Sequence, residues 1–237
     1  MTLLIRPATP ADLPAIEAVM RTSMAALGAT FYDQHQTASA VRYIAVADPQ
    51  LVADGTYFVI EDEDQIVACG GWSKRKKLFT GEPPVILSEA KDLPRLDADR
   101  TAGGDPSPSS RLLVTPEVSS TSMRLAKVVQ RSSGLANQRN RPCRLRMTDL
   151  LDPATEPARI RAMFVLPSHA RRGIGRMIID RAEAEAREAG FAVCELMATL
   201  PGVPLYRACG YEPLETVEIE LPDGVRLECL RMSRCVK

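Results

Sequence analysis

The hydrophobic positions of the chain recur at two different spacings, which predict helices in some segments and strands in others. Ile174, Ile178 and Ala182 are spaced four residues apart, which predicts one face of a long helix. Gly190 is typical of the position just after the end of such a helix. By contrast, the β-branched and aromatic run TYFVIE, residues 56–61, predicts a strand.

The same two patterns extend over most of the chain. The expected strands cover residues 3–9, 56–61, 66–72, 157–165, 191–199, 216–221 and 225–232. The expected helices cover residues 9–23, 33–47, 174–190 and 203–210, with Thr9 as the cap of the first. Two pairs of strands are joined by the turns DEDQ and PDG and should form hairpins. Strands and helices in this order predict a mixed α/β fold.

The segment from residue 83 to residue 147 differs in composition from the rest of the chain. It is rich in Ser, Pro, Gly and Arg and has no sustained period. Such a segment buries too little apolar surface to offset the entropy lost on ordering. We therefore expect a disordered, low-complexity insertion in a single domain formed by residues 1–82 and 148–237. Because its second half is basic, a contact arm for nucleic acid or the ribosome is the alternative to a solvated linker.

Composition and charge narrow the class of protein. With 45% apolar residues among 237, the chain can bury a core of one good-sized domain. Lys and Arg number 30, as do Asp and Glu, which argues against a surface devoted to nucleic acid. No run approaches the roughly 18 apolar residues of a membrane helix. The start, MTLLIRPATP, lacks the apolar stretch of a signal peptide, and the six cysteines form no CxxC pair, so we expect a reduced, cytoplasmic protein.

The stretch HARRGIGRMIID, residues 169–180, places three arginines and two glycines at the start of the long helix. It lacks the Lys-Ser or Lys-Thr of a P-loop. The dinucleotide fingerprint matches at Gly173 and Gly175 but has Ile178 in its third position, and a loop separates the glycines from the preceding strand. The better hypothesis is a pyrophosphate bound by backbone N–H groups, since glycine allows close approach and arginine suits phosphate. A helix start with solvated arginines is the alternative.

These motifs occur in an order that resembles the GNAT (general N-acetyltransferase) superfamily. A strand that ends in MFV is followed by LPSHARRGIGRMII, by the strand ELMAT and by LYRACGYEP. The stretches GGWS, LDPATEPARIRAMFV and ELMATLPGVPLYRACGYEP resemble one bacterial branch of that superfamily. The resemblance covers the N-terminal region through Trp72 and about residues 153–232. It leaves out residues 83–147, where VILSEAKDL resembles the translated product of a dispersed genomic repeat.

The resemblance implies a GNAT-type fold, in which a mixed sheet splays open beside the strand ending at Val165 and binds acetyl-CoA as co-substrate, without a metal. Main-chain groups of Met163, Phe164 and Val165 would bind the pantetheine like an added strand. The residues implied for the pyrophosphate are Arg171, Arg172, Gly173, Ile174, Gly175 and Arg176. The family motif [Q/R]-x-x-G-x-[G/A] has Ala170 in its first position here, which removes a side-chain contact but leaves the backbone donors.

The resemblance also implies two catalytic groups. The backbone N–H of Val165 would stabilise the oxyanion, and Tyr206 in LYRACGY would be the general acid that protonates the departing thiolate. Packing of the short helix is the alternative role for Tyr206. Cys209 lies three residues further, but no histidine is near it in sequence, so we expect a buried thiol and not a nucleophile.

The acceptor site is less well defined by the residues. Many relatives have a glutamate base where this chain has Arg159. The base would therefore be Glu195 or ordered water, or else the amine would arrive largely neutral. Alternation along the strand places Arg159 and Arg161 on one face with Met163 and Val165. Arginines there suggest an acceptor amine that carries a carboxylate, as in a small amine or a peptide end. A β-bulge would instead turn both arginines to solvent.

Trp72, which ends the strand IVACGGW, would wall the acceptor pocket next to its two glycines or else pack in the core. Together these features predict an acetyl-CoA-dependent N-acetyltransferase, an acyltransferase in which the amine attacks directly in a ternary complex. A catalytically silent CoA-binding sensor or interaction domain is the alternative. We expect a small-molecule or peptide amine as partner, and neither membrane nor nucleic acid. The oligomeric state stays open, with a homodimer as one option.

Overall fold

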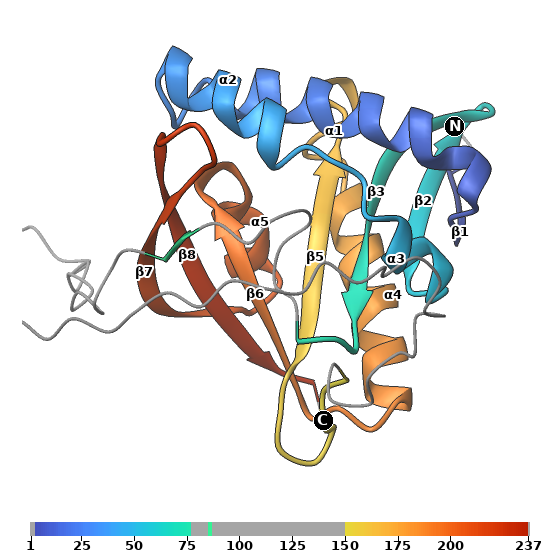
Figure 1. Ribbon diagram of the computed structural model, residues 1–237. Coiled ribbons are helices and arrows are strands. Elements are labelled where there is room, and N and C mark those ends of the chain that lie inside the picture. Colours follow the sequence, from blue (N-terminus) through green and yellow to red (C-terminus); the bar gives the residue numbers. More distant parts are fainter. Residues whose placement is uncertain (1–2, 77–84, 87–149, 237) are drawn as a thin grey trace, which may run out of the picture. The chain divides into compact units, whose positions relative to one another are not determined.

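Strands from both ends of the chain pair in one eight-stranded sheet, in the order β1-β2-β3-β5-β6-β8-β7-β4 (Figure 1). The structure, a computed structural model, describes residues 3–76, 85–86 and 150–236. The strands are β1 (Leu3–Pro7), β2 (Tyr57–Asp62), β3 (Gln65–Ser73), β4 (Val85–Ile86), β5 (Ala158–Val165), β6 (Val193–Thr199), β7 (Glu212–Glu220) and β8 (Arg226–Cys235). Within this sheet β5 and β6 pair in parallel and the other neighbours antiparallel, so the mixed α/β class predicted from the sequence is confirmed.

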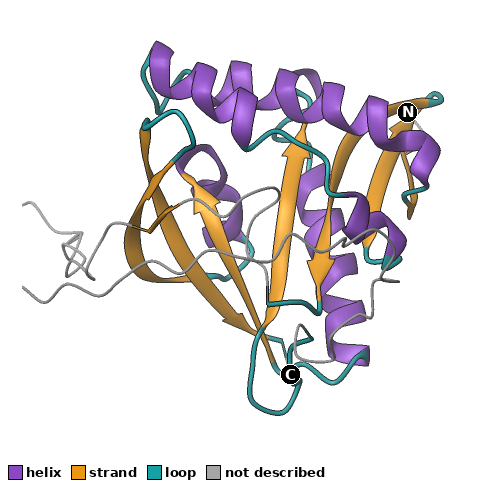
Figure 2. Cartoon of the chain, in the orientation of Figure 1, coloured by secondary structure: helices purple, strands orange, loops and turns teal. Residues whose placement is uncertain are grey.

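Helices cover both faces of this sheet (Figure 2). They are α1 (Leu13–Gly28), α2 (Gln34–Tyr43), α3 (Pro49–Ala53), α4 (Ile174–Glu188) and α5 (Val203–Ala208), with short 3-10 turns η1 (Pro10–Asp12), η3 (Pro167–His169) and η4 (Leu200–Gly202). Apolar residues of α1 and α2 pack on one face, and those of α4 and α5 pack on the other. Only α3 was not predicted, because a five-residue helix is too short to show a period.

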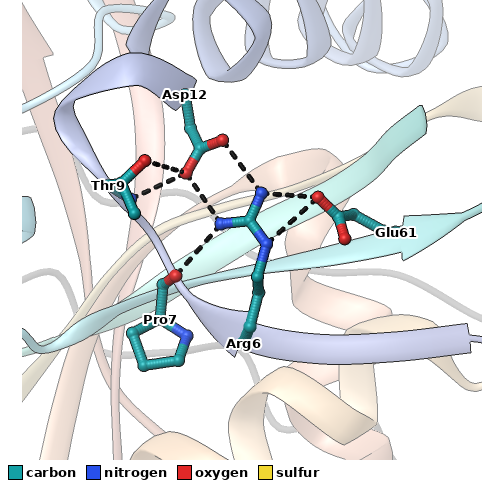
Figure 3. Close-up of polar contacts among 5 residues, drawn as sticks. All are labelled: Arg6, Pro7, Thr9, Asp12 and Glu61. Carbon is teal, nitrogen blue, oxygen red and sulfur yellow. Dashed lines mark hydrogen bonds and ion pairs between the residues drawn. The ribbon is translucent and has the colours of Figure 1, made fainter. Parts of the chain in front are cut away.

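A charged cluster attaches the start of α1 to the sheet, as Figure 3 shows. The guanidinium of Arg6 on β1 donates to both carboxylate oxygens of Asp12, at 2.8 and 2.9 Å, and to Glu61 on β2. Asp12 also accepts from the backbone N–H of Thr9 at 2.7 Å. Thr9 is the N-cap of the short turn η1, whereas Asp12 is the N-cap of α1, so the expected cap lies one turn too early. The guanidinium beside it holds the pKa of Asp12 well below its usual value. This cluster therefore fixes the angle at which α1 leaves the sheet.

The insertion predicted for residues 83–147 lies outside the described residues, except for β4. Val85 and Ile86 form an edge strand that pairs with β7, which the composition of the segment did not predict. At the other end of the connection, Arg75 and Leu150 form an antiparallel bridge, and the N–H of Leu151 donates to the carbonyl of Lys74 at 2.8 Å. The two flanks of residues 77–149 therefore lie side by side. No helix in the described part is long and apolar enough to cross a membrane.

Candidate functional site

The sheet opens between its two parallel strands. Only the first residues of β5 and β6 pair, Ala158 with Cys194 and Arg159 with Glu195. Beyond this closed end the strands diverge, and Figure 1 shows their arrowheads well apart. The C-terminal half of β5 consequently has no strand beside it on that side. These are the splayed strands that the family resemblance implied.

A β-bulge in β5 lies beside this opening. Gly71 pairs with Arg161 and Cys69 with Phe164, so β5 has one more residue than β3 in this interval. The backbone of Ala162 is left-handed, with φ of 52°, which costs roughly 1–2 kcal/mol for a residue with a Cβ. The hydroxyl of Tyr57 donates to the carbonyl of Ala162 at 2.7 Å and holds the bulge in place.

The bulge is followed by backbone groups that face the opening. The N–H of Leu166 donates to the carbonyl of Val67 on β3 at 2.8 Å. Peptide groups alternate in direction along a strand, so those of Val165 and Met163 point away from β3 and into the opening. Those of Phe164 point toward β3. Two of the three residues expected to bind pantetheine are therefore oriented for an added strand, and Phe164 is not.

The N-terminus of α4 lies close to the C-terminal end of β5 and forms the second part of the site. Gly173 is the N-cap, with φ of 80°, and Arg171 two residues earlier also has a left-handed backbone, with φ of 64°. Among the described residues no side chain caps this helix. A Cβ on Gly173 would meet no atom within 4 Å, so the glycine is needed for its conformation and not for lack of space. Uncapped N–H groups beside arginines favour an anion.

Two residues of the same motif have a packing role. A Cβ on Gly175 would lie 2.7 Å from Leu205 Cδ2, so this glycine lets α4 pack closely on α5. Arg176 donates from its guanidinium to the carbonyl of Ala208 at the end of α5. Ile174 is buried in the core under the motif. The arginine-glycine stretch thus positions α5 as well as presenting its backbone.

Tyr206, the predicted general acid, lies on α5 on the same side of the sheet as α4. Its side chain is buried, and its ring packs edge-on against Tyr211 with centroids 5.9 Å apart. Burial raises the pKa of Tyr206 above its usual value, which keeps the hydroxyl protonated. The nearby thiol of Cys209 is buried at the helix end, as expected, and burial raises its pKa too. A thiol in that state is a poor nucleophile.

The bulge corrects the expected orientation of the two arginines. Arg161 and Phe164 pair with Gly71 and Cys69, which lie on the same face of β3, so both side chains point toward α1. Met163 instead packs with Ile178 of α4. The expectation that both arginines share a face with Met163 and Val165 was therefore wrong. The solvent-facing alternative is wrong as well. Arg161 is only 4% exposed and lies 3.2 Å from Asp48, a residue the sequence did not indicate.

Arg159 belongs to a longer row of charges that the sequence did not reveal. Its Nη1 lies 2.5 Å from Glu195, and Glu195 also accepts from Arg231 Nε at 2.8 Å. Arg231 in turn lies 2.6 Å from Glu215. These contacts raise the pKa of Arg231. Glu195, the candidate base, is therefore an ion-pair partner of two guanidinium groups. Only the pairing of β6, β8 and β7 brings these residues together, so no local pattern could have predicted the row.

The GGWS stretch is closely packed. The ring of Trp72 lies edge-on to Phe191, with centroids 5.9 Å apart, and its indole N–H donates to Glu185 at 3.3 Å. These contacts favour the core role over the pocket wall. A Cβ on Gly70 would collide with Met163, and one on Gly71 would lie 2.8 Å from the Cα of Tyr57. Both glycines therefore allow close packing against neighbouring strands and side chains.

Two further features lie away from the opening. His169 Nε2 is 3.3 Å from Asp62 and so faces a carboxylate. A cleft of about 450 Å³ lies between α1 and the β2–β3 turn, where two of its carboxylates, Asp12 and Glu61, already bind Arg6. In the described ranges, no three His, Cys, Asp or Glu side chains are grouped as a metal site would need.

Residues 143–213 match the family model described as the acetyltransferase (GNAT) domain. The match spans β5, α4, β6 and α5, which form the opening and both of its flanking elements. The resemblance to the GNAT superfamily is thereby confirmed. No curated protein sequence matches the chain.

Alignments with solved structures extend over nearly the whole length of the chain. The PaiA N-acetyltransferase from Thermoplasma acidophilum, in complex with coenzyme A, has a TM-score of 0.53 at 10% identity and covers 99% of each chain. A GCN5-related N-acetyltransferase from Rhodopseudomonas palustris has a TM-score of 0.56 at 14% identity, over 99% of this chain and 96% of its own. YncA from Salmonella typhimurium, with its cofactor acetyl-CoA, has a TM-score of 0.50 at 13% identity, over 100% and 95%. Identities this low indicate a common fold.

Proposed function

Because residues 143–213 of the chain match the acetyltransferase (GNAT) domain, we propose that the protein transfers the acetyl group of acetyl-CoA to a primary amine by direct attack in a ternary complex. The observation that carries this proposal is the opening between β5 and β6. It has a bulged strand with outward-facing peptide groups on one side and an uncapped helix N-terminus at its end. An extended thioester that ends in a pyrophosphate has complementary chemistry. Acetyl-CoA would supply the activated acetyl group.

The residues present fit such a co-substrate. The N–H groups at the start of α4, together with Arg171 and Arg172, would bind the pyrophosphate. The peptide groups of Met163 and Val165 would bind the pantetheine along the free edge of β5. The N–H of Val165 would also donate to the thioester carbonyl oxygen, where negative charge develops. Ile174, Gly175 and Arg176 would contribute through the backbone of the first helical turn.

Proton transfer would be shared between Tyr206 and water. Tyr206 is held protonated by burial, so it can donate a proton to the departing thiolate. Glu195 is bound by two arginines and is better assigned to charge balance than to accepting the proton of the amine. An ordered water, or an amine that arrives neutral, would take that role. The five cysteines of the described part are free thiols, in keeping with a cytoplasmic location.

A CoA-binding sensor without turnover is the second candidate. The observation that favours it is the row of ion pairs where a free carboxylate base would be expected. Release of thiol from acetyl-CoA in the presence of mixed amine acceptors separates the two candidates. An enzyme yields thiol in proportion to an acceptor that gains the mass of an acetyl group. A sensor binds CoA and gives neither product.

The pyrophosphate site can be tested with a matched pair of glycines. Gly173 and Gly224 both have φ of 80°, and a Cβ added to either would meet no atom within 4 Å, but Gly224 lies in the β7–β8 turn. Asp tolerates this backbone, so Gly173→Asp and Gly224→Asp should cost similar, small amounts of stability. Only Gly173→Asp places a negative charge beside the pyrophosphate. We expect it to raise the dissociation constant for CoA at least tenfold in calorimetry.

The control variant, Gly224→Asp, should bind CoA like the unaltered protein. Equal CoA affinity in both variants would show that the diphosphate is bound elsewhere, and the proposed function would lose its main support. Chemical unfolding of both variants checks that any difference in affinity does not arise from a difference in folding.

A further inference from the structure

Four charged side chains from four strands form a row across the closed end of the opening. Arg159 (β5), Glu195 (β6), Arg231 (β8) and Glu215 (β7) alternate in sign, and neighbouring pairs are 2.5 to 2.8 Å apart. The row begins at the last paired residues of β5 and β6, Arg159 and Glu195. It therefore marks the point from which the two strands diverge.

A ligand in the opening would point toward this row. The start of α4 lies beyond the C-terminal end of β5, whereas the row lies near the N-terminal end of the same strand. A CoA whose pyrophosphate binds at α4 and whose pantetheine follows the edge of β5 would run toward Arg159. The acyl end, and the amine that attacks it, would then lie at the end of the opening that carries the charges. This step rests on the proposed function.

The row has unmet hydrogen-bonding capacity. Nε of Arg159 is buried and has no hydrogen-bond acceptor among the described residues, whereas Nη1 of the same side chain is paired with Glu195 at 2.5 Å. A buried donor is costly to leave unpaired, and native proteins rarely leave one so. Farther along the row, the side chain of Arg231 is 39% exposed. Guanidinium donors match the two oxygens of a carboxylate.

Arg161 differs from Arg159 in the exposure of its side chain and in its partners. Its side chain is 4% exposed, and it lies against Asp48, the N-cap of α3. It also makes a further interaction within the structure. Of these two arginines, Arg159 is the one with a buried donor that has no acceptor among residues 3–76, 85–86 and 150–236.

We propose that Arg159 and Arg231 form a carboxylate-binding subsite that selects acceptors with a free carboxylate near the amine, such as an amino acid or the end of a short peptide. The alternation of charge supports a zwitterionic ligand, because its carboxylate would meet the two arginines while its amine stays near Glu195 or Glu215. Arg161 contributes to the fold and not to selection.

The test compares ligands that differ only in the carboxylate. An N-acetyl amino acid and its amide are titrated into the CoA-loaded full-length chain by calorimetry, which does not depend on turnover. We expect the acid to bind at least tenfold more tightly than the amide. Arg231→Gln should remove most of that difference, because Arg231 is partly exposed and can be changed with little effect on folding. Arg226→Gln, at an exposed arginine of the same strand that lies 3.5 Å from Glu220, should leave the difference intact.

A second variant and a kinetic assay complete the test. Arg159→Lys keeps the charge but loses the guanidinium fork, so it should raise KM for the amino acid while KM for acetyl-CoA is unchanged. Equal binding of acid and amide, absence of binding by both, or faster acetylation of polyamines than of amino acids would overturn the subsite. Thiol release with polyamines would leave the proposed acetyl transfer standing. Failure of all acceptors, together with loss of CoA binding, would instead reject the proposed function.

Discussion

Removal of residues 77–149 should leave a folded and more stable protein. The flanks of this segment are held together without it, by the Arg75–Leu150 bridge and by the hydrogen bond from Leu151 to Lys74. Arg75 also donates twice to Asp54, at 2.6 and 2.7 Å. A short turn between Lys76 and Leu150 therefore only has to connect two chain ends that are already adjacent.

The expected gain follows from the entropy of closing the loop. Each doubling of the length of a flexible connection costs about 0.6 kcal/mol. Shortening roughly seventy residues to about four removes about four doublings, which should raise the free energy of unfolding by about 2.5 kcal/mol. The excision also removes β4, whose pairing with β7 contributes about 0.5–1.5 kcal/mol for each backbone hydrogen bond. If two such bonds are lost at about 0.75 kcal/mol each, the net expectation is a gain of about 1 kcal/mol.

Two excised chains that differ only in linker length measure the entropic contribution to stability alone, because β4 is absent from both. Linkers of about 4 and about 16 Gly and Ser residues differ by two doublings, so the shorter should be more stable by about 1.2 kcal/mol. Urea unfolding followed by the fluorescence of Trp72, the single tryptophan, measures this difference. Trp72 is a suitable probe because it is buried against Phe191.

Two results would refute this reasoning. One is equal stability of the two linker lengths, which would show that the ends are not held together independently of the loop. The other is a loss of more than about 2 kcal/mol in both excised chains relative to the full chain, which exceeds what the loss of β4 explains. In that case residues 77–149 would contribute contacts of their own to the core.

Three other predictions concern catalysis, packing and pH. Tyr206→Phe should lower kcat about 100-fold with little change in CoA affinity, whereas Tyr211→Phe, at its ring neighbour, should not. Gly71→Ala should destabilise the fold by about 2–3 kcal/mol, because its Cβ would collide with the backbone carbonyl of Thr56 and neither strand can yield. Burial raises the pKa of three thiols from 9.0 to about 12. The contribution of these thiols to the free energy of unfolding is therefore fully present below pH 9, and it should fall by roughly 1 kcal/mol per thiol between pH 9 and 10. These thiols belong to Cys69, Cys194 and Cys229.

For each of these three predictions, one experimental result would contradict it. An unchanged kcat in Tyr206→Phe would leave that tyrosine with a packing role only. A melting temperature for Gly71→Ala within a degree of the parent would mean that β2 and β3 can separate locally. A free energy of unfolding that is flat from pH 8 to pH 10 would mean that the thiols ionise as easily in the folded chain as in the unfolded chain.

The helices and strands of this fold could be predicted from the sequence alone. So could the part of the site that one short segment forms, the N-terminus of α4. Helical spacing predicted α1, α2 and α4, alternation and β-branched runs predicted the strands, and the helix N-terminus at Gly173 followed from its own motif. Such features are local, because a period or a left-handed glycine is a property of neighbouring residues. The same local signals carried the family resemblance.

The orientation of charges at the opening was decided by tertiary structure. One extra residue at Ala162 reversed which face of β5 the arginines occupy, and a bulge of this kind depends on register with β3. The partners of those arginines, Asp48 and Arg231 among them, come from segments far apart in the chain and meet only through strand pairing. Pairing between distant strands has no signature in either strand alone. The sequence therefore indicated the helix N-terminus at Gly173 but not the charged row at the closed end of the opening.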